Sequence, residues 1–278
     1  MSEPGPERRH GLPEIRRARD YHLYDGNGRR YLDLHQNGGR AILSHRPKGL
    51  VKRLKGVVDQ GLWGEYPSVY TRRLEAVLRV LFPAYPEVRL YATAERAVAA
   101  AGGAVADPAL GDDGGAGGSR AAWWRPFLPA DSSELLLPVL PFPASFAPQP
   151  VCAVRPGLLR DSDAVSPVLL SGLVQAAHLI AAAPGGGGGG RAGAAGLVPD
   201  AAVYPITLFD ERALTLWRRR GPYLQLRCSE ESFSGVFSAF LDAGIIINPV
   251  FPGPSILPQW CSRGEFEKFV KVSRMAES

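Results

Sequence analysis

The side chains that most often carry out catalysis, namely histidine, cysteine and lysine, are few in this 278-residue chain. Its three cysteines, Cys152, Cys228 and Cys261, form no CxxC pair, so they indicate neither a zinc site nor a disulfide framework. The five histidines have no metal-ligand spacing with Cys, Asp or Glu, and we therefore expect no metal site. No lysine occurs between Lys55 and Lys268, so we expect no lysine-based Schiff-base chemistry from that stretch.

One turn has the features of an anion site, because it joins an expected strand at residues 88–91 to an alanine-rich helix at 95–101. Free backbone N–H groups and the positive end of the helix dipole attract anions at a helix N-terminus. Thr93, Ala94 and Glu95 are the candidate phosphate-binding residues, with the Thr93 hydroxyl as a further donor. The alternative is a plain N-capped helix, because Glu95 brings a negative charge of its own.

A second candidate is the aromatic segment Trp123-Trp124-Arg125-Pro126-Phe127, whose rings could stack on a planar or cationic ligand. A loop held to the core by two large side chains is the simpler interpretation. The chain has no Gly-x-Ser-x-Gly, Walker or G-x-G-x-x-G pattern, and its six consecutive glycines lack the lysine and hydroxyl of a phosphate cradle.

Composition indicates a globular chain that can bury a core in one large or two modest domains, with 45% hydrophobic and 21% charged residues. Basic residues comprise 27 arginines and five lysines, so the lysine gap partly reflects a preference for arginine. Residues 1–89 hold 17 basic and 10 acidic side chains, a net charge of +7. We expect a solvated basic face rather than a nucleic-acid site, since no aromatics are interleaved for base stacking.

The N-terminal residues are charged and proline-containing where a signal peptide needs an apolar stretch, and the isolated cysteines favour a reducing cytoplasm. The most apolar window, residues 165–183, carries Gln175 and His178. Ser166 as N-cap and Pro167 at the first helical position predict a buried helix there rather than a membrane span.

Local patterns predict an α/β chain. Residues 21–34 predict a β-hairpin, because the Asp-Gly and Asn-Gly pairs within them tolerate positive φ. Periodicity and flanking turns predict further helices at 47–60, 68–81, 165–183, 210–220, 232–243 and 265–272, and further strands at 201–204, 223–228 and 245–247. The prolines of segment 126–156 leave room for short strands at 135–137 and 151–154. Glycine or proline dominates segments 102–118, 126–156 and 184–196, which we expect to be loops.

Three segments resemble class III aminotransferases, which have fold type I of the pyridoxal-phosphate (PLP) enzymes. DGNGRRYLDL, residues 25–34, is similar to the family's Gly-x-x-Tyr-Leu-Asp hairpin, and Ser44-His45-Arg46-Pro47 to its Gly-His-x-Pro turn, with Ser44 replacing the glycine. LYATAERAVAAA, residues 90–101, looks like the Ser-Gly-Thr-Glu-Ala segment that grips the cofactor phosphate, although its glycine is missing. Residues 233–270 resemble the small domain that closes this fold.

The resemblance implies three functional residues, each of which is missing or in question here. A lysine should form the internal aldimine, yet the middle of the chain has none. An aspartate should bind the pyridine nitrogen, and Asp161 and Asp163 are candidates, although capping of the following helix explains them more simply. An arginine commonly holds the substrate carboxylate, but residues 254–258 contain none and Arg263 is the first to follow.

We therefore expect a reduced PLP-transferase-like fold with a mostly parallel central sheet. Residues 1–62 and 223–278 should form a small α+β domain, and residues 63–222 a reduced large domain of the cofactor-binding type. The first functional hypothesis is a cytoplasmic binding or structural protein without transaminase activity, forming a homo-oligomer or pairing with a related subunit. Two alternative hypotheses leave the function open. One requires a bound small ligand and the other does not.

One alternative is an enzyme that uses PLP or another small anionic ligand non-covalently. Its base would be an acidic residue or His178, because some sugar-modifying relatives of this fold use a histidine in place of the lysine. A histidine in an apolar helix is more often a core or edge residue. The other alternative is a basic interaction module that needs no cofactor and does not span a membrane.

Overall fold

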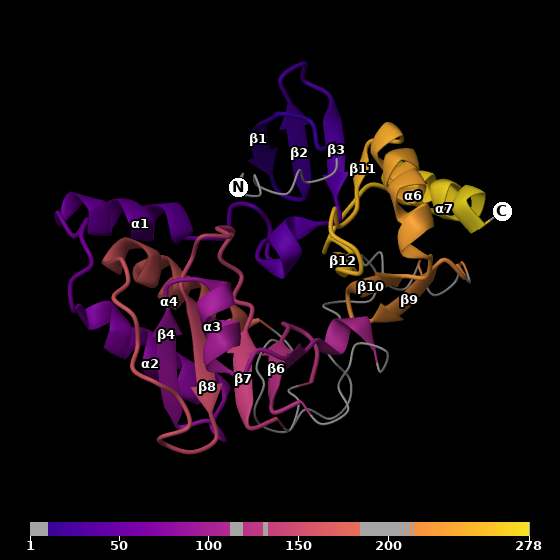
Figure 1. The fold of residues 1–278 in the computed structure, drawn as a ribbon. Helices are drawn as coiled ribbons and strands as arrows, with labels where there is room; N and C mark the ends of the chain where they lie inside the picture. Colours follow the sequence, from indigo (N-terminus) through magenta and orange to yellow (C-terminus); the bar gives the residue numbers. More distant parts are fainter. Residues whose placement is uncertain are drawn as a thin grey trace, which may run out of the picture. The chain divides into compact units, whose positions relative to one another are not determined.

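The computed structural model describes residues 11–111, 119–129, 133–183, 209, 212 and 214–277, and it divides the chain into two compact units (Figure 1). Unit 1 comprises Met1–Gly38 and Val203–Ser278, and unit 2 comprises Gly39–Ala202. These boundaries differ from the expected ones after residues 62 and 222. Helix α1 (Leu50–Asp59) packs on a helix of unit 2 and therefore belongs to that unit. Strand β9 (Trp217–Arg220) pairs with a strand of unit 1 and belongs there.

Unit 2 is built on a five-stranded mixed sheet, in which one strand alone runs against the other four. The strands, in their order across the sheet, are β4 (Glu87–Tyr91), β8 (Gln149–Ala153), β7 (Leu135–Pro138), β6 (Ala121–Trp124) and β5 (Val105–Ala106). Strand β8 runs antiparallel to both neighbours, whereas β7, β6 and β5 are parallel. Only residues 139–148 join β7 to β8, which is too short for a crossover helix, so β8 runs antiparallel to β7.

Helices cover both faces of this sheet. On one face lie α1, α2 (Val69–Leu81) and α4 (Pro167–Ala182), and on the other lies α3 (Ala94–Ala100). Alternation along β7 explains this, because Leu136 joins the core under the three helices while Leu135 and Leu137 join the α3 core. Neither α4 nor any other helix in the described part of the chain combines the length and apolarity needed to cross a membrane.

The described residues of unit 1 include two small sheets and helices that pack around one core. The first sheet has the order β1 (Ile15–Arg19), β2 (His22–Asp25), β3 (Arg30–Asp33), β11 (Ile245–Ile246), and the second has β12 (Ser255–Ile256), β10 (Tyr223–Leu226), β9. Helices α6 (Glu230–Asp242) and α7 (Arg263–Glu277) pack in the same core. The pairing of β2 with β3 confirms the predicted hairpin. Two short 3-10 helices, η1 (Gln36–Gly39) and η2 (Pro108–Leu110), complete the described elements.

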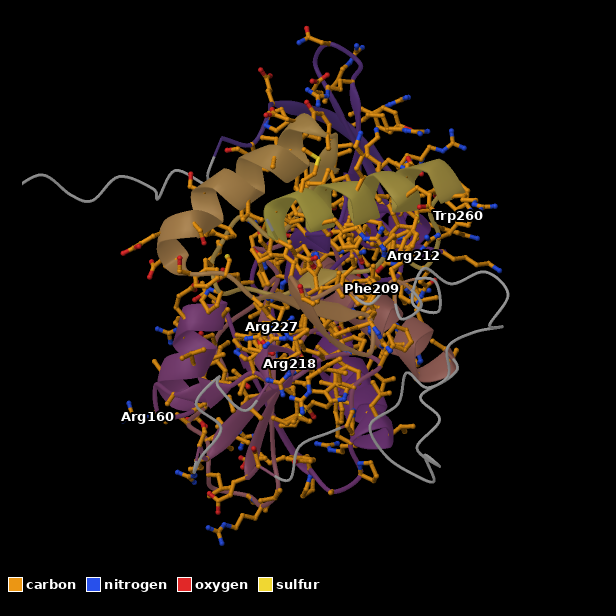
Figure 2. All side chains as sticks on the ribbon, turned by 90° about the vertical axis from the view of Figure 1, so that its right-hand side faces the viewer. Arg160, Phe209, Arg212, Arg218, Arg227 and Trp260 are labelled. Carbon is orange, nitrogen blue, oxygen red and sulfur yellow. The ribbon has the colours of Figure 1, made fainter. Side chains whose placement is uncertain are left out.

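Two strands occupy segments for which the sequence predicted something else. Trp123 and Trp124, which were expected in a loop, lie in β6, and residues 217–220 form β9 rather than the last turn of a helix. The predicted strand at 201–204 and the glycine-rich segment 184–196 lie outside the described residues. Two residues labelled in Figure 2 contact α7. The centroid of the Phe209 ring lies 6.1 Å from that of Phe269, and the Arg212 guanidinium donates a hydrogen bond to Glu267.

Candidate functional site

The turn predicted to bind phosphate lies where β4 ends and α3 begins. Thr93 is the N-cap of α3, and its hydroxyl oxygen accepts a hydrogen bond from the Arg96 backbone N–H at 3.3 Å. Glu95 lies in the first turn, where a hydrogen bond with Thr93 lowers the pKa of its carboxyl. The local geometry is therefore that of a capped helix, and Ala94 is simply its first residue.

A carboxylate of the chain itself occupies this turn. Asp163 accepts a hydrogen bond from the backbone N–H of Ala92 at 2.9 Å, and the Arg96 guanidinium donates to both of its oxygens, at 2.6 and 2.5 Å. The Arg96 hydrogen bonds, followed by the Ala92 backbone N–H, lower the pKa of Asp163. An internal anion thus takes the donors that an external phosphate would need.

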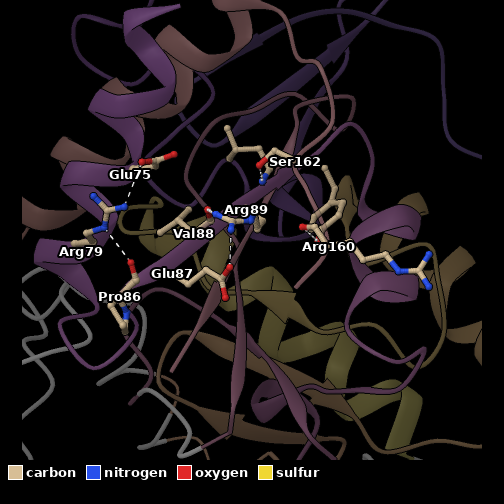
Figure 3. Close-up of polar contacts among 10 residues, drawn as sticks. Glu75, Arg79, Pro86, Glu87, Val88, Arg89, Arg160 and Ser162 are labelled. Carbon is tan, nitrogen blue, oxygen red and sulfur yellow. Dashed lines mark hydrogen bonds and ion pairs between the residues drawn. The ribbon is translucent and has the colours of Figure 1, made fainter. Parts of the chain in front are cut away.

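Arg160 and Ser162, which precede Asp163 in the chain, form hydrogen bonds with residues of β4 (Figure 3). The Asp163 N–H donates to the Leu90 carbonyl at 2.8 Å, and the Leu90 N–H donates to the Ser162 hydroxyl at 3.0 Å. The Tyr91 hydroxyl donates to the Arg160 carbonyl at 3.2 Å. The capping role expected for Asp163 was wrong, because its carboxylate serves the start of α3, while Ser166 precedes α4 without a side-chain cap bond. Asp161, the second of the two candidates, is exposed.

The residues at this turn do not fit the phosphate of PLP, the cofactor that the resemblance implies. The N–H of Ala92 and the hydroxyl of Thr93 are already engaged, and two carboxylates lie beside them. Three of the five lysines, at positions 48, 52 and 55, are exposed in or just before α1, and the other two belong to α7.

His178, the candidate base, is exposed on α4. Gln175, one turn earlier, donates a hydrogen bond from its side-chain amide to the Lys48 carbonyl at 3.1 Å, which joins α4 to the segment before α1. The position fits an edge residue of an apolar helix. Arg263, the first arginine after the 254–258 loop, is exposed at the first position of α7.

The aromatic segment contributes to the core rather than to a stacking surface. Trp124 is 1% exposed and packs edge-on against Phe82 with ring centroids 4.9 Å apart, while Trp123 points to the α3 face of the sheet. Burial raises the pKa of the Cys152 thiol in β8, and burial followed by the Glu265 charge raises that of Cys261 to about 12. In the described segments, no group of three or more His, Cys, Asp or Glu residues is placed to hold a metal.

The sequence did not single out a cluster of polar side chains at the edge of the sheet where β5, β6 and β7 end. Arg125 follows β6 and forms a two-pronged ion pair with Asp107, which follows β5, at 2.7 and 2.5 Å. Arg40 donates to the side-chain oxygen of Gln149, the first residue of β8, at 3.1 Å. These four residues come from four separate segments of the chain. The local feature that could have indicated the cluster is a polar residue directly after each of two apolar strands, namely Asp107 and Arg125.

No family model matches the chain, but known proteins are similar to it in sequence. A protein of Treponema pallidum described as uncharacterized is 31% identical over 288 residues, covering 88% of this chain and 88% of that protein. Another uncharacterized protein, from Borreliella burgdorferi, is 51% identical over 59 residues, or 21% of this chain and 22% of its own length.

Among solved structures, an omega-transaminase from Sphaerobacter thermophilus matches with a TM-score of 0.64 and 14% identity over 95% of this chain and 90% of that one. The ornithine delta-aminotransferase of Plasmodium falciparum matches with a TM-score of 0.66 and 11% identity over 95% and 93%. These identities are low, so the structures show the fold alone. The chain belongs to the same family as the Treponema pallidum protein and has the fold of the PLP-dependent aminotransferases.

Proposed function

We propose that this protein is a binding or structural protein with an aminotransferase fold that does not carry out transamination. The observation that carries this proposal is the Asp163 carboxylate, which holds the Ala92 N–H and Arg96 at the turn where the resemblance implies a cofactor phosphate. The lysine gap between Lys55 and Lys268 supports it, because aldimine formation needs a lysine amine. We further propose that the protein works in the cytoplasm as a homo-oligomer or with a related subunit.

The competing proposal is an enzyme that uses PLP non-covalently with His178 as its base. A general base must lie within hydrogen-bond reach of the proton that it removes. His178 is exposed on α4, whereas the anion-type turn belongs to β4 and α3. No observation favours this alternative over the first proposal.

The decisive experiment mixes the purified full-length protein with PLP and records the visible spectrum before and after borohydride, followed by intact mass measurement. We expect no saturable aldimine band and no one-to-one reduced adduct. A known aminotransferase treated identically is the positive control. A variant with Lys48, Lys52 and Lys55 replaced by arginine controls for random modification of the exposed lysines near α1.

A stoichiometric adduct that forms in the wild-type protein and maps to a single lysine would overturn the proposal. Saturable PLP binding without fixation, together with amino-group transfer between an amino acid and a keto acid, would establish the competing proposal instead. Background labelling that disappears in the triple arginine variant would agree with the first proposal, because it reports exposed amines and not a site.

A further inference from the structure

Arg40 differs from the other arginines at the sheet edge of unit 2 because a neutral amide is its hydrogen-bond partner. Gln149, which is fully buried, accepts from Arg40 through its oxygen and donates through its nitrogen to the carbonyls of Pro138 and Pro150, at 2.8 and 3.0 Å. Those bonds fix the amide, and the amide in turn fixes one arm of the guanidinium. Within the described ranges, no carboxylate lies in ion-pair distance of Arg40.

A second guanidinium lies nearby. Pro138, which holds Gln149, pairs across the sheet with Trp124, and Arg125 is the next residue along the chain. The charge of Arg125 is matched by Asp107, whose two oxygens it contacts, and both side chains are largely buried. Arg40 is therefore the arginine of this cluster whose positive charge is not balanced by a carboxylate of the described residues. Burial, and then the charge of Arg125, lower the pKa of Arg40 from its usual value.

The backbone next to Arg125 is also unusual. Residues 125–128 form a tight turn closed by a hydrogen bond from the Leu128 N–H to the Arg125 carbonyl at 3.1 Å, with Pro126 and Phe127 at its centre. Phe127 has a φ of 66°, in the left-handed region where a residue with a side chain is strained. Such strain is kept where the surrounding structure needs a particular geometry.

We propose that Arg40, with Arg125 beside it, binds a small oxyanion, namely a carboxylate or phosphate group of a ligand. A half-buried guanidinium whose positive charge is not matched by a carboxylate costs free energy that a bound anion would recover. The planar fork of arginine donates two parallel hydrogen bonds to carboxylate or phosphate. Gln149 leaves the remaining donors of Arg40 for that purpose.

The place in the fold supports the same conclusion. Strands β4, β5, β6 and β7 all point toward this edge, and ligands of α/β sheets bind outside the carboxyl ends of the strands. The proposed site uses none of Thr93, Ala94 and Glu95, and it requires neither the presence nor the absence of transaminase chemistry.

The test titrates inorganic phosphate and, separately, malonate into the full-length protein by calorimetry, at constant ionic strength maintained with sodium chloride. We expect saturable binding of at least one of them, weakened at least tenfold in Arg40→Gln. Arg40→Lys keeps the charge but loses the fork, so binding should fall several-fold. Arg46→Gln is the matched control, because it removes the same charge from an exposed position six residues away and should bind like the wild type.

The two probes distinguish the sources of the oxyanion, since preference for phosphate indicates a phosphorylated ligand and preference for malonate a carboxylic acid. Arg40→Gln should fold, because it removes a charge that lies beside another cation, and its thermal unfolding is measured to verify this. Equal binding by Arg40→Gln and Arg46→Gln would overturn the proposal. The proposal would also be overturned if neither phosphate nor malonate bound at a concentration of about 10 mM.

Discussion

Ser44 shows at the scale of one residue how the chain departs from the family that it resembles. It stands where the related turn has glycine, and its φ is 83°, in the left-handed region that glycine enters without strain. Its hydroxyl accepts a hydrogen bond from the Arg46 N–H at 3.2 Å, which offsets part of the strain. The serine therefore adopts a backbone conformation that suits glycine better, at a cost in conformational energy.

Replacing Ser44 by glycine and by alanine separates the two effects. Alanine keeps the strained backbone and loses the hydrogen bond, whereas glycine loses the bond but relieves the strain. We expect Ser44→Gly to be more stable than Ser44→Ala by about 1 kcal/mol, measured by urea denaturation. An alanine variant as stable as the glycine variant would contradict the left-handed geometry at this position.

The candidate site illustrates what the sequence can and cannot predict about single residues. Thr93 as N-cap of a short helix follows from its position before an alanine-rich run. The partner of that turn, Asp163, lies 71 residues from Ala92, and no local pattern connects them. The same holds for Arg40 and Gln149, which are 109 residues apart. Local chemistry could be predicted, but the pairing that decides it depends on the fold.

At the scale of one element, the start of α7 depends on a capping box. The Glu265 carboxylate accepts from the backbone N–H and the hydroxyl of Ser262, at 2.9 and 2.7 Å, and the Glu265 N–H donates to the Ser262 hydroxyl. Its other oxygen lies 2.8 Å from the His22 ring and 2.9 Å from the Arg30 guanidinium. One side chain thus caps the helix and joins it to the β2–β3 hairpin.

Removal of this side chain should destabilise the protein. We expect Glu265→Ala to lower the free energy of unfolding by about 2 kcal/mol, and Glu265→Gln by about half as much because its amide oxygen can still accept. Burial raises the pKa of Glu265, but the hydrogen bonds from Ser262 and His22 outweigh it, so that the net shift is downward.

The downward shift sets the direction of the pH dependence. A carboxyl group whose pKa is lower in the folded state stabilises the fold above its unfolded value, near 4.3, and loses that contribution as the pH falls through the folded value. The difference between wild type and Glu265→Gln in denaturation experiments should therefore shrink below about pH 4. A difference that stays constant from pH 7 to pH 3 would show that the charge of Glu265 contributes nothing.

The elements that the sequence predicted incorrectly lack a local signature. Strand β6 pairs with β5 and β7 in parallel, so both partners lie elsewhere in the chain, and its flanking proline suggested a loop. Strand β9 begins a hairpin in which Arg220 pairs with Tyr223 across Gly221 and Pro222. The glycine there has a φ of 54°, typical of a two-residue hairpin loop, but three consecutive arginines suggested the last turn of a helix.

At the scale of the whole molecule, the chain builds separate hydrophobic cores in its two units. The core beneath α1, α2 and α4 contains Ile180, which is fully buried, and the core of unit 1 contains Ile245, which is 1% exposed. No residue belongs to both clusters among the described residues. The two units have other bounds than the domains expected from the sequence, because the segments at 39–62 and 203–222 belong to the opposite unit.

Separate cores predict that small cavities in each should have additive effects. Ile180→Val and Ile245→Val each remove one buried methyl group and should each lower the free energy of unfolding by about 1 kcal/mol. The double variant should lose the sum, within about 0.5 kcal/mol, because residues that share no packing partner do not couple. Denaturation of the four proteins under one condition measures this, with the slope against denaturant checked for constancy. A coupling energy near 1 kcal/mol would mean that packing is shared between these two clusters, and their separation would then be wrong.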